Sequence, residues 1–294
     1  MKILVIGSRG FIGSYLTVAL QSLGSVVVES LASVEPEILQ GCQARKITDI
    51  FQTHKPDICV NCSGAANVSY SFSNPRDDFF KNTVSVYEML AAIQSVSPHT
   101  KFVHLSSAAV YGNPNILPIP ETAPTSPVSP YGFHKLAAEQ SCREFSMLYG
   151  VKAVSLRIFS AYGPGLRKQL LWDTFQKWKQ SKVIELSGTG KETRDFIFIQ
   201  DLCSAIIKVI QNADFNGEAI NIASGISISV REIVSLLVGE LGGEREIRFI
   251  GNERTGDPSF WRADINALEK FGFNAQTSIE NGVKATAKWQ KEQG

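Results

Sequence analysis

The first 23 residues combine three features that together restrict the fold more than any other part of the chain. Residues 3–6 are a short, wholly apolar run, typical of a strand buried on both faces. Three glycines follow at once with the spacing G-x-x-G-x-x-G: Gly7, Gly10 and Gly13. Apolar residues at helical spacing over 14–23 then predict a helix. This order of strand, glycine loop and helix predicts a dinucleotide-binding unit within a doubly wound, parallel α/β sheet.

Each glycine of the loop has a separate physical task. Gly7 permits a tight turn, and Gly13 lets the helix pack close to the strand. Gly10 lets the backbone approach a pyrophosphate at the helix N-terminus, where free N–H groups and the helix dipole favour anions. The other loop residues predicted to contact the cofactor are Arg9, Phe11 and Ile12.

The second predicted strand ends at Glu29, and this residue bears on the choice of cofactor. An acid about 20 residues beyond the glycine loop is placed to hold a ribose diol. A carboxylate there repels a 2′-phosphate and so favours NAD. Arg9 favours NADP instead, because a guanidinium in the loop can contact that phosphate. The sequence favours NAD and leaves NADP open.

Alternating segments continue the α/β pattern and place two more residues at the cofactor. The small residues 63–66, Ala65 among them, follow a predicted strand and suit close passage of a cofactor over the backbone. Asn82 lies among apolar helical positions, where it either hydrogen-bonds a backbone group or lies on the surface. The remaining predicted helices are 47–57, 77–94 and 131–149, and the strands are 26–29, 58–61, 101–105, 153–159 and 218–222.

A tyrosine and a lysine share one face of the helix predicted from residue 131. Ser129 is suited to cap this helix and Pro130 to occupy its first position. Tyr131 and Lys135 are four residues apart, so their side chains are neighbours. A cation beside a phenol favours the phenolate and lowers the pKa, which suits a catalytic acid or base. The spacing alone is also compatible with an ordinary tyrosine and a solvated lysine.

Ser107 is the third candidate at this place. It follows the predicted strand 101–105, and ligands in doubly wound sheets lie at the carboxyl ends of strands. A hydroxyl at that position is therefore a candidate catalytic group. His104, within the strand, is expected in the core, and His134 on the surface or at a partner contact.

Composition excludes several classes of function. The 294 residues are 44% hydrophobic, enough for one large α/β domain or slightly more. The net charge is +1, so no overall field predicts nucleic acid as a partner. The first apolar run stops at Gly7, too short for a signal peptide or a membrane span. We expect no nucleic-acid partner and no membrane partner.

The cysteines predict a reduced, cytoplasmic compartment. There are five of them and they show no disulfide framework spacing. Cys59 and Cys62 spell C-x-x-C, but residues three apart on a strand point to opposite faces. No second pair completes a zinc site, so no metal is expected.

Seven motifs occur in the order seen in one known family. They are G-x-x-G-F-I-G at 7–13, S-S-A-A-V-Y-G at 106–112, S-P-Y-G-x-x-K at 129–135, L-R-I-F-x-x-Y-G-P-G at 156–165, two glycines and R-D-F within 188–196, G-E-A-I-N-I-A-S-G at 217–225, and R-T-G-D at 254–257. By these motifs the chain resembles the extended short-chain dehydrogenase/reductases, in their nucleotide-sugar epimerase/dehydratase branch. The resemblance covers nearly the whole chain.

The resemblance implies a role for each matching residue. Tyr131 matches the acid–base residue, Lys135 the group that lowers its pKa and holds the nicotinamide ribose, and Ser107 the hydroxyl that orients the reacting oxygen. The substrate-side residues implied, besides Ser107, are Ser160, Arg194, Arg254 and Asp257. A planar guanidinium suits phosphate oxygens, in agreement with a nucleoside-diphosphate sugar as the substrate.

The resemblance also implies a Rossmann-type fold with a smaller, interleaved C-terminal substrate lobe. We expect the dinucleotide-binding domain at 1–162, with return segments at about 197–224. The substrate lobe is expected at 163–196 and 225–294. Helices 77–94 and 131–149 resemble the pair through which family members form homodimers, with Phe133, Ala137 and Met147 able to serve either core or interface.

Departures from the family pattern narrow the reaction. Sugar 4,6-dehydratases of the family place an acidic pair where this chain has Ala108 and Ala109, so dehydration is not expected. The epimerase-reductases that make GDP-fucose use a cysteine and a histidine in regions filled here by Ala109 and by Gly165-Leu166. Many relatives have Asn at the position of Ser160, so the sugar or phosphate contact there is open.

Hydride transfer at carbon 4 of a nucleotide-linked sugar remains. The favoured hypothesis is an NAD-dependent 4-epimerase, which oxidises carbon 4 and returns the hydride to the other face. The alternative is a 4-keto-6-deoxy-sugar reductase that uses NADPH or NADH. A protein that binds a dinucleotide only as a sensor has no need for Tyr131 or Lys135, and both are present. The sequence does not identify the nucleoside, the sugar or the product stereochemistry.

Overall fold

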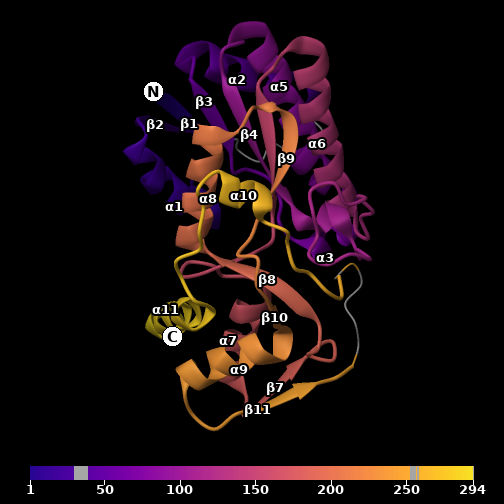
Figure 1. Ribbon diagram of the computed structural model, residues 1–294, viewed down its shortest axis with the longest axis vertical. Coiled ribbons are helices and arrows are strands. Elements are labelled where there is room, and N and C mark those ends of the chain that lie inside the picture. The colour runs from indigo at the N-terminus through magenta and orange to yellow at the C-terminus, as the bar shows by residue number, and fades with distance from the viewer. Residues whose placement is uncertain (30–38, 252–255, 257, 294) are drawn as a thin grey trace.

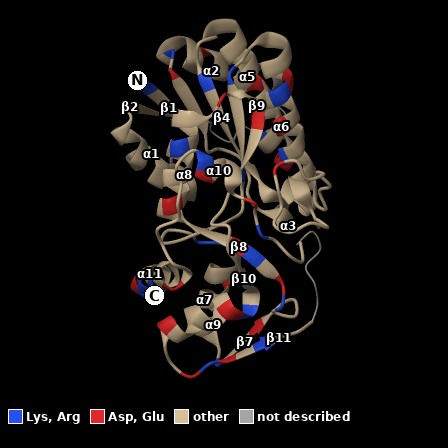
Figure 2. Ribbon diagram, in the orientation of Figure 1, with Lys and Arg blue, Asp and Glu red and all other residues tan. Residues whose placement is uncertain are grey.

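The computed structural model describes residues 1–29, 39–251, 256 and 258–293, with the backbone alone given for 39–43. The larger part of the molecule surrounds a central sheet, and a smaller part lies below it (Figure 1). Figure 2 shows acidic and basic residues spread over both parts, in keeping with the net charge of +1. None of the helices in the described part of the chain is both long and apolar enough to cross a membrane.

The central sheet has six parallel strands in the order β2-β1-β3-β4-β5-β9. This is the Rossmann-type doubly wound α/β sheet that the sequence predicts. The strands are β1 Lys2–Ile6, β2 Ser25–Glu29, β3 Ile58–Asn61, β4 Lys101–Ser107, β5 Ala153–Ile158 and β9 Asn216–Ile222.

Alternating residues of the buried strands feed two cores, one on each face of the sheet. Ile3 and Val5 of β1 pack in a cluster with α1 (Phe11–Ala19) and α8 (Ile199–Asn212). Leu4 and Ile6 pack in a second cluster, with α2, α5 and α6. The bounds of these helices are α2 Leu39–His54, α5 Ser85–Val96 and α6 Pro130–Tyr149. Burial on both faces explains why β1 is wholly apolar.

The smaller part is built from two further sheets. One has the order β10-β8-β6, and the other pairs β11 with β7 in parallel. Its elements are β6 Ser160–Tyr162, α7 Gln169–Gln180, β7 Val183–Leu186, β8 Thr193–Phe198, β10 Ser227–Ser229, α9 Val230–Leu241, β11 Glu246–Phe249 and α11 Ile279–Glu292. The short helix α10 (Asn266–Lys270) packs on β9 and α8 of the larger part (Figure 1). The chain returns to the large sheet through β9 between β8 and β10.

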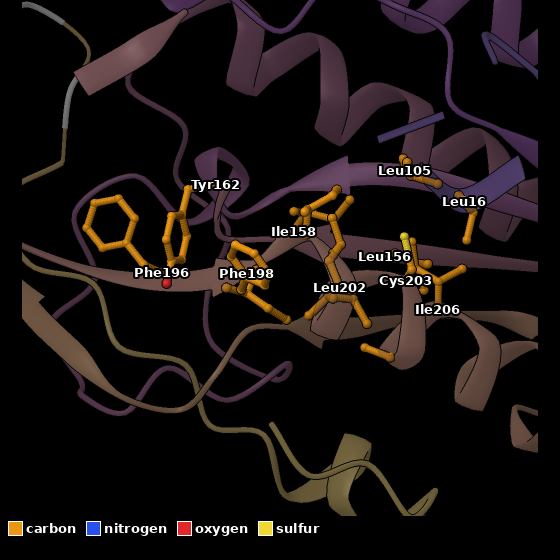
Figure 3. Close-up of a cluster of buried hydrophobic side chains, with 14 of the residues drawn as sticks. Leu16, Leu105, Leu156, Ile158, Tyr162, Phe196, Phe198, Leu202, Cys203 and Ile206 are labelled. Atoms are coloured by element: carbon orange, nitrogen blue, oxygen red, sulfur yellow. The ribbon is translucent and has the colours of Figure 1, made fainter. Parts of the chain in front are cut away.

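One hydrophobic cluster runs from the large sheet into the smaller part. Tyr162 packs edge-on against Phe196 and Phe198, with ring centroids 5.8 and 5.5 Å apart. Figure 3 shows these rings on one side and Leu202, Cys203 and Leu16 on the other. The two parts therefore share core contacts rather than being joined by a linker.

Most predicted elements are confirmed within one or two residues. The helix predicted at 47–57 is wrong at both ends, since α2 covers Leu39–His54. The helix predicted at 77–94 is a run of α4 (Pro75–Phe79), a π-helical turn η2 (Phe80–Val84) and α5. Cys59 and Cys62 are free and pack in the two different clusters, as strand alternation predicts.

Candidate active site

The start of α6 holds Tyr131 in place through its own capping contacts. The Ser129 side chain accepts a hydrogen bond from the Gly132 backbone N–H at 3.1 Å, and Pro130 occupies the first turn. The Tyr131 backbone N–H donates to Ser71 Oγ at 3.1 Å. Tyr131 is buried, with 8% of its surface exposed. The cap expected from the sequence is confirmed, and it fixes the backbone position from which the Tyr131 side chain extends.

Ser107 meets Tyr131 at the carboxyl end of β4. Its hydroxyl accepts a hydrogen bond from the Ala109 N–H at 3.2 Å, which caps the short 3₁₀ turn η3 (Ala108–Tyr111). The same hydroxyl is hydrogen-bonded to the Tyr131 side chain. The structure therefore brings together two candidates that lie 24 residues apart in the sequence.

The phenol of Tyr131 titrates higher than an ordinary tyrosine. Burial raises its pKa to about 12, the Ser107 hydrogen bond acts in the opposite direction, and the Asp78 charge raises it further. The sequence predicts a lowered pKa because of the neighbouring Lys135. Lys135 Nζ does lie 5.9 Å from the centre of the Tyr131 ring. That prediction is wrong for the chain's own groups, since loss of hydration outweighs the cation.

Lys135 is buried beneath the end of the sheet. Only 5% of its surface is exposed, and its ammonium donates to the Leu105 carbonyl of β4 at 2.9 Å. Burial lowers the pKa of Lys135 to about 8, while Asp78 and Glu139 act in the opposite direction. The predicted solvated alternative is wrong, because this ammonium faces the sheet and not solvent.

The glycine loop forms a close-packed cradle at the start of α1. Gly7 has φ +87°, and a Cβ built on it would lie 2.6 Å from the Ser63 nitrogen. A Cβ on Gly13 would lie 2.2 Å from the Gly7 carbonyl oxygen. Gly10 is the N-cap of α1, and among the described residues no side chain caps the first turn of this helix. Helix amides left free in this way bind phosphate.

Glu29 lies next to this loop but already has a partner. Its backbone carbonyl accepts a hydrogen bond from Gly7 at 3.1 Å. Its carboxylate lies 3.0 Å from His54 Nε2 on α2, and both side chains are partly exposed. Arg9 is exposed in the loop. No local pattern predicts the His54 contact, which joins residues 25 positions apart.

Asn82 is one of the most enclosed polar side chains at the site. It is 1% exposed and lies in the π-helical turn, so the surface alternative is wrong. The other alternative, a hydrogen bond to a backbone group, is not found within the described residues either. Neither its Oδ1 nor its Nδ2 has a hydrogen-bond partner within the described part of the chain. A Cβ on Gly64 would lie 2.6 Å from Asn82 Oδ1, so this amide faces the small-residue segment that includes Ala65. Unpaired buried amide atoms of this kind are available to a ligand.

The structure describes only two of the four further residues that the sequence predicts to bind the substrate. Arg194 lies on β8, with its guanidinium 5.6 Å from the centre of the Trp261 ring and one Nη donating to the Thr193 carbonyl at 2.9 Å. Ser160 begins β6 directly after β5 and is half-buried. Arg254 and Asp257 lie outside the described residues.

The sequence did not predict a buried polar network that lies under the site. Arg157 on β5 forms a salt bridge with Glu139 on α6, with Nη2 2.8 Å from Oε2. Glu139 also accepts from Ser106 Oγ at 2.5 Å. Arg157 donates to the Tyr111 hydroxyl, which donates in turn to Asn221 Oδ1 on β9. These contacts tie the Tyr131 helix to three strand ends, and no local spacing reveals them.

A second contact of this kind joins His134 to Asp78. His134 Nδ1 lies 2.6 Å from the fully buried Asp78 carboxylate and its side chain is 15% exposed, so the expected surface position is wrong, while a partner contact stays a prediction. His104 is buried as expected, and burial lowers its pKa. Across the described ranges, no group of three or more His, Cys, Asp or Glu side chains is arranged to hold a metal ion.

Known proteins resemble this chain in sequence and in fold over nearly its full length. A UDP-glucose 4-epimerase of Azospirillum brasilense is 28% identical over 322 residues, covering 99% of this chain and 92% of that protein. The solved structure of a Thermotoga maritima UDP-glucose 4-epimerase with UDP-glucose is 26% identical, with a TM-score of 0.88 and coverage of 100% and 99% of the two chains. A Bacillus cereus UDP-glucuronic acid 4-epimerase, solved with UDP-glucuronic acid and NAD, is 24% identical, with a TM-score of 0.88 and full coverage of both chains. The last likeness shows a shared fold.

The family assignment rests on a match that spans most of the chain. The model described as the NAD dependent epimerase/dehydratase family matches residues 3–223, about three quarters of the sequence. The matched part contains the glycine loop, Ser107, Tyr131 and Lys135. The chain therefore belongs to the NAD dependent epimerase/dehydratase family.

Proposed function

We propose that this protein is an NAD-dependent 4-epimerase of nucleoside-diphosphate sugars. The observation that carries the proposal is the contact of Tyr131 with Ser107 at the end of β4, with Lys135 buried one turn along the same helix. Relatives over nearly the full length are UDP-sugar 4-epimerases, which makes a UDP-sugar the first substrate to test.

The residues present fit NAD. The cradle leaves no room for a Cβ at Gly7 and Gly13, and Gly10 begins a helix whose first amides are uncapped, as a pyrophosphate requires. The unpaired amide of Asn82, beside the 63–66 segment with Ala65, offers a donor and an acceptor to the bound cofactor. Arg9, Phe11, Ile12 and Glu29 complete the proposed site. When bound, NAD supplies the hydride acceptor and donor for carbon 4 of the sugar.

Within this proposal the chain's own residues move the proton. Tyr131 accepts the proton of the C4 hydroxyl through its phenolic oxygen. It returns the proton to the C4 oxygen after the keto sugar has rotated to present its other face. Ser107, already hydrogen-bonded to the phenol, orients the reacting oxygen. Lys135 supplies a positive charge on the same face, which favours phenolate once the site is filled and further screened from water.

We propose that the smaller part binds the nucleotide-sugar, through the segments 163–196 and 225–294, whereas 1–162 with about 197–224 binds the cofactor. Arg194 lies on β8, and its planar guanidinium can donate two parallel hydrogen bonds to the oxygens of a diphosphate. Ser160, Arg254 and Asp257 complete the proposed substrate set by their match to the family motifs. We expect activity in the cytoplasm, in keeping with the free cysteines at 59, 62, 142 and 203.

One observation keeps an NADPH-dependent 4-keto-sugar reductase as the alternative. Glu29, the proposed ribose ligand, already pairs with His54, and Arg9 is exposed in the glycine loop, where it can meet a 2′-phosphate. The two functions differ in cofactor turnover. An epimerase returns its hydride and consumes no cofactor, while a reductase oxidises one NADPH per product.

We propose a homodimer formed by α5 and α6. Both helices carry exposed apolar side chains that a monomer leaves in water: Tyr87, Phe133, Met147 and Leu148. Patches of this kind mark interaction surfaces.

The decisive experiment is a turnover assay on the purified full chain. UDP-glucose and UDP-galactose are each incubated with catalytic NAD, and the products are separated by chromatography, with NADH and NADPH absorbance followed in parallel. The proposal predicts interconversion without net change in cofactor absorbance. Stoichiometric oxidation of NADPH by a 4-keto-6-deoxy sugar nucleotide, with no interconversion, would support the reductase instead.

A further inference from the structure

A second pair of titratable side chains lies beside Tyr131 and Lys135. His134 stands three residues after Tyr131 and directly before Lys135 on α6. Its Nδ1 lies 2.6 Å from Asp78 Oδ2 on α4. Since an ionised carboxylate only accepts, the imidazole donates this hydrogen bond from Nδ1. The pair thus connects the helix of the acid–base residue to the helical run that carries Asn82.

Asp78 is enclosed to an unusual degree for a carboxylate. It has 0% exposed surface, and its Oδ1 has no hydrogen-bond partner within the described residues. Phe79 packs edge-on against its partner ring at 5.2 Å, and Thr83 donates to the backbone carbonyl of His134 at 2.8 Å. A buried charge with one unsatisfied oxygen costs stability, so stability does not explain its presence.

The field of this carboxylate reaches both active-site residues. Asp78 raises the pKa of Tyr131 in the same direction as burial, and it raises the pKa of Lys135 against burial. Electrostatic interactions in such a buried site act over longer distances, because little water screens them. The negative charge therefore favours the protonated form of both groups.

The other charged and titratable groups around Asp78 are already engaged with one another. From η2, Lys81 pairs with Asp77 at 2.6 Å. From α3 (Val68–Ser73), the Tyr70 hydroxyl donates to the same Asp77 carboxylate at 2.7 Å. The Asp78 carboxylate thus contacts His134 on α6, and its charge also acts on Tyr70 and Lys81, though less than that of Asp77, which contacts both.

We propose that Asp78 is a positioning residue of the active site, whose buried carboxylate, held by His134, keeps Lys135 protonated and keeps the proton on the Tyr131 phenol until the site is filled. This inference rests on the proposed function, because it assigns the proton that the reaction moves. Asp78 acts through Tyr131 and Lys135 and contacts neither carbon 4 nor the cofactor in this assignment.

The test is the pH profile of kcat/KM for Asp78→Asn, which removes the charge and keeps the shape. Without the carboxylate, Tyr131 and Lys135 both lose their proton more easily, so both limbs of the profile move to lower pH, by about one unit. A purely structural role predicts slower turnover at every pH with both limbs unmoved. That result, in a variant whose melting temperature shows it is folded, would overturn the proposal.

A matched control lies one residue away. Asp77→Asn removes one charge from the same helix, at a side chain that is 27% exposed and does not act on Tyr131 or Lys135. Its profile is expected to keep both limbs in place. An equal shift in Asp77→Asn would show that any charge on α4 has this effect, which contradicts a specific role for Asp78.

A second readout does not depend on turnover. 3-Fluorotyrosine is incorporated at position 131 and its phenol is titrated by fluorine NMR in the wild-type and Asp78→Asn backgrounds. The phenol is expected to titrate about one unit lower in the variant. Should Asp78→Asn fail to fold, the smaller Asp78→Ser also removes the charge, and the phenol is again expected to titrate lower than in the wild type.

The two readouts separate the two proposals. A shifted phenol in a chain that turns over no nucleotide-sugar would leave this inference standing and reject the proposed function. Turnover with an unmoved phenol in every folded variant would reject this inference alone.

Discussion

At the scale of single residues, the site depends on two groups whose burial changes their acidity. Tyr131 and Lys135 share a helix face, yet burial moves the pKa of the phenol up to about 12 and that of the ammonium down to about 8. Both shifts disfavour the charged forms, as loss of hydration requires. In the chain by itself Tyr131 is an acid holding its proton, so the base form must be favoured by what binds beside it.

Replacement of Tyr131 by Phe removes the hydroxyl and leaves the ring in place. General acid–base catalysis contributes about 10²- to 10⁴-fold, so we expect turnover to fall by about a thousand-fold. NAD binding, measured by the rise in melting temperature that it causes, is expected to change little. Full turnover in this variant would show that another group moves the proton.

Replacement of Lys135 by Met tests the cost of a buried ammonium. At pH 7 we expect the variant to be more stable, on the order of 2 kcal/mol, because the wild type buries a charge that hydration would otherwise favour. Lys135 has a lowered pKa in the fold, about 8 against about 10.4 unfolded, so the unfolded chain binds more protons between these values. The wild type gains stability there as pH rises.

The difference between the two proteins should therefore shrink from pH 8 to pH 10, as measured by urea unfolding at each pH. Comparison at equal pH cancels the groups that the two proteins share. A difference that stays constant across this range would contradict the assigned pKa.

At the scale of elements, the first helix must lie against the first strand for the loop to work. Gly13→Ala places a Cβ 2.2 Å from the Gly7 carbonyl oxygen, so α1 has to move. We expect a loss of about 3 kcal/mol in the free energy of unfolding and no rise in melting temperature with NAD.

The matched control is Gly239→Ala in α9, where nothing lies within 4 Å of the new Cβ. A gain of about 0.5 to 1 kcal/mol is expected there, because alanine favours the helix. Equal effects of the two substitutions would mean that the close approach at Gly13 is unimportant.

Elements with local signals were predictable from the sequence. Ser129 and Pro130 place the start of α6 within one residue through its cap and first turn, and Gly150 forms its left-handed end. The glycine loop places α1, and strand ends place Ser107 near Tyr131. These signals are properties of short segments, and the resemblance to a family added the roles.

Long-range and environmental features were not predictable from such segments. The Asp78–His134 and Glu139–Arg157 contacts join residues 56 and 18 positions apart, and each carboxylate is an ordinary helical residue in the sequence. The raised pKa of Tyr131 arises mainly from burial, which depends on how α3, α4 and η2 pack on α6. Sequence reasoning sees the neighbouring lysine but not this packing.

At the scale of the whole molecule, the exposed apolar face of α5 and α6 predicts assembly. Phe133 is 58% exposed on a helix whose opposite face holds Tyr131 and Lys135 in the core. We expect a dimer by light scattering, twice the chain mass of 32.2 kDa, and a monomer after Phe133→Lys.

Val18→Lys provides the control for that measurement. Val18 is 67% exposed but lies on α1, which packs on the other face of the sheet. Its variant should remain a dimer. A wild-type chain that is monomeric at micromolar concentration would contradict the assembly proposed for α5 and α6.

The most direct test of the whole account follows the hydrogen at carbon 4. UDP-glucose carrying deuterium at C4 is incubated with the protein and NAD in ordinary water, and the UDP-galactose formed is analysed by mass spectrometry. The account predicts product that keeps the deuterium at C4, since the hydride leaves and returns within one site while Tyr131 exchanges only the hydroxyl proton. Product with hydrogen in place of deuterium would contradict it.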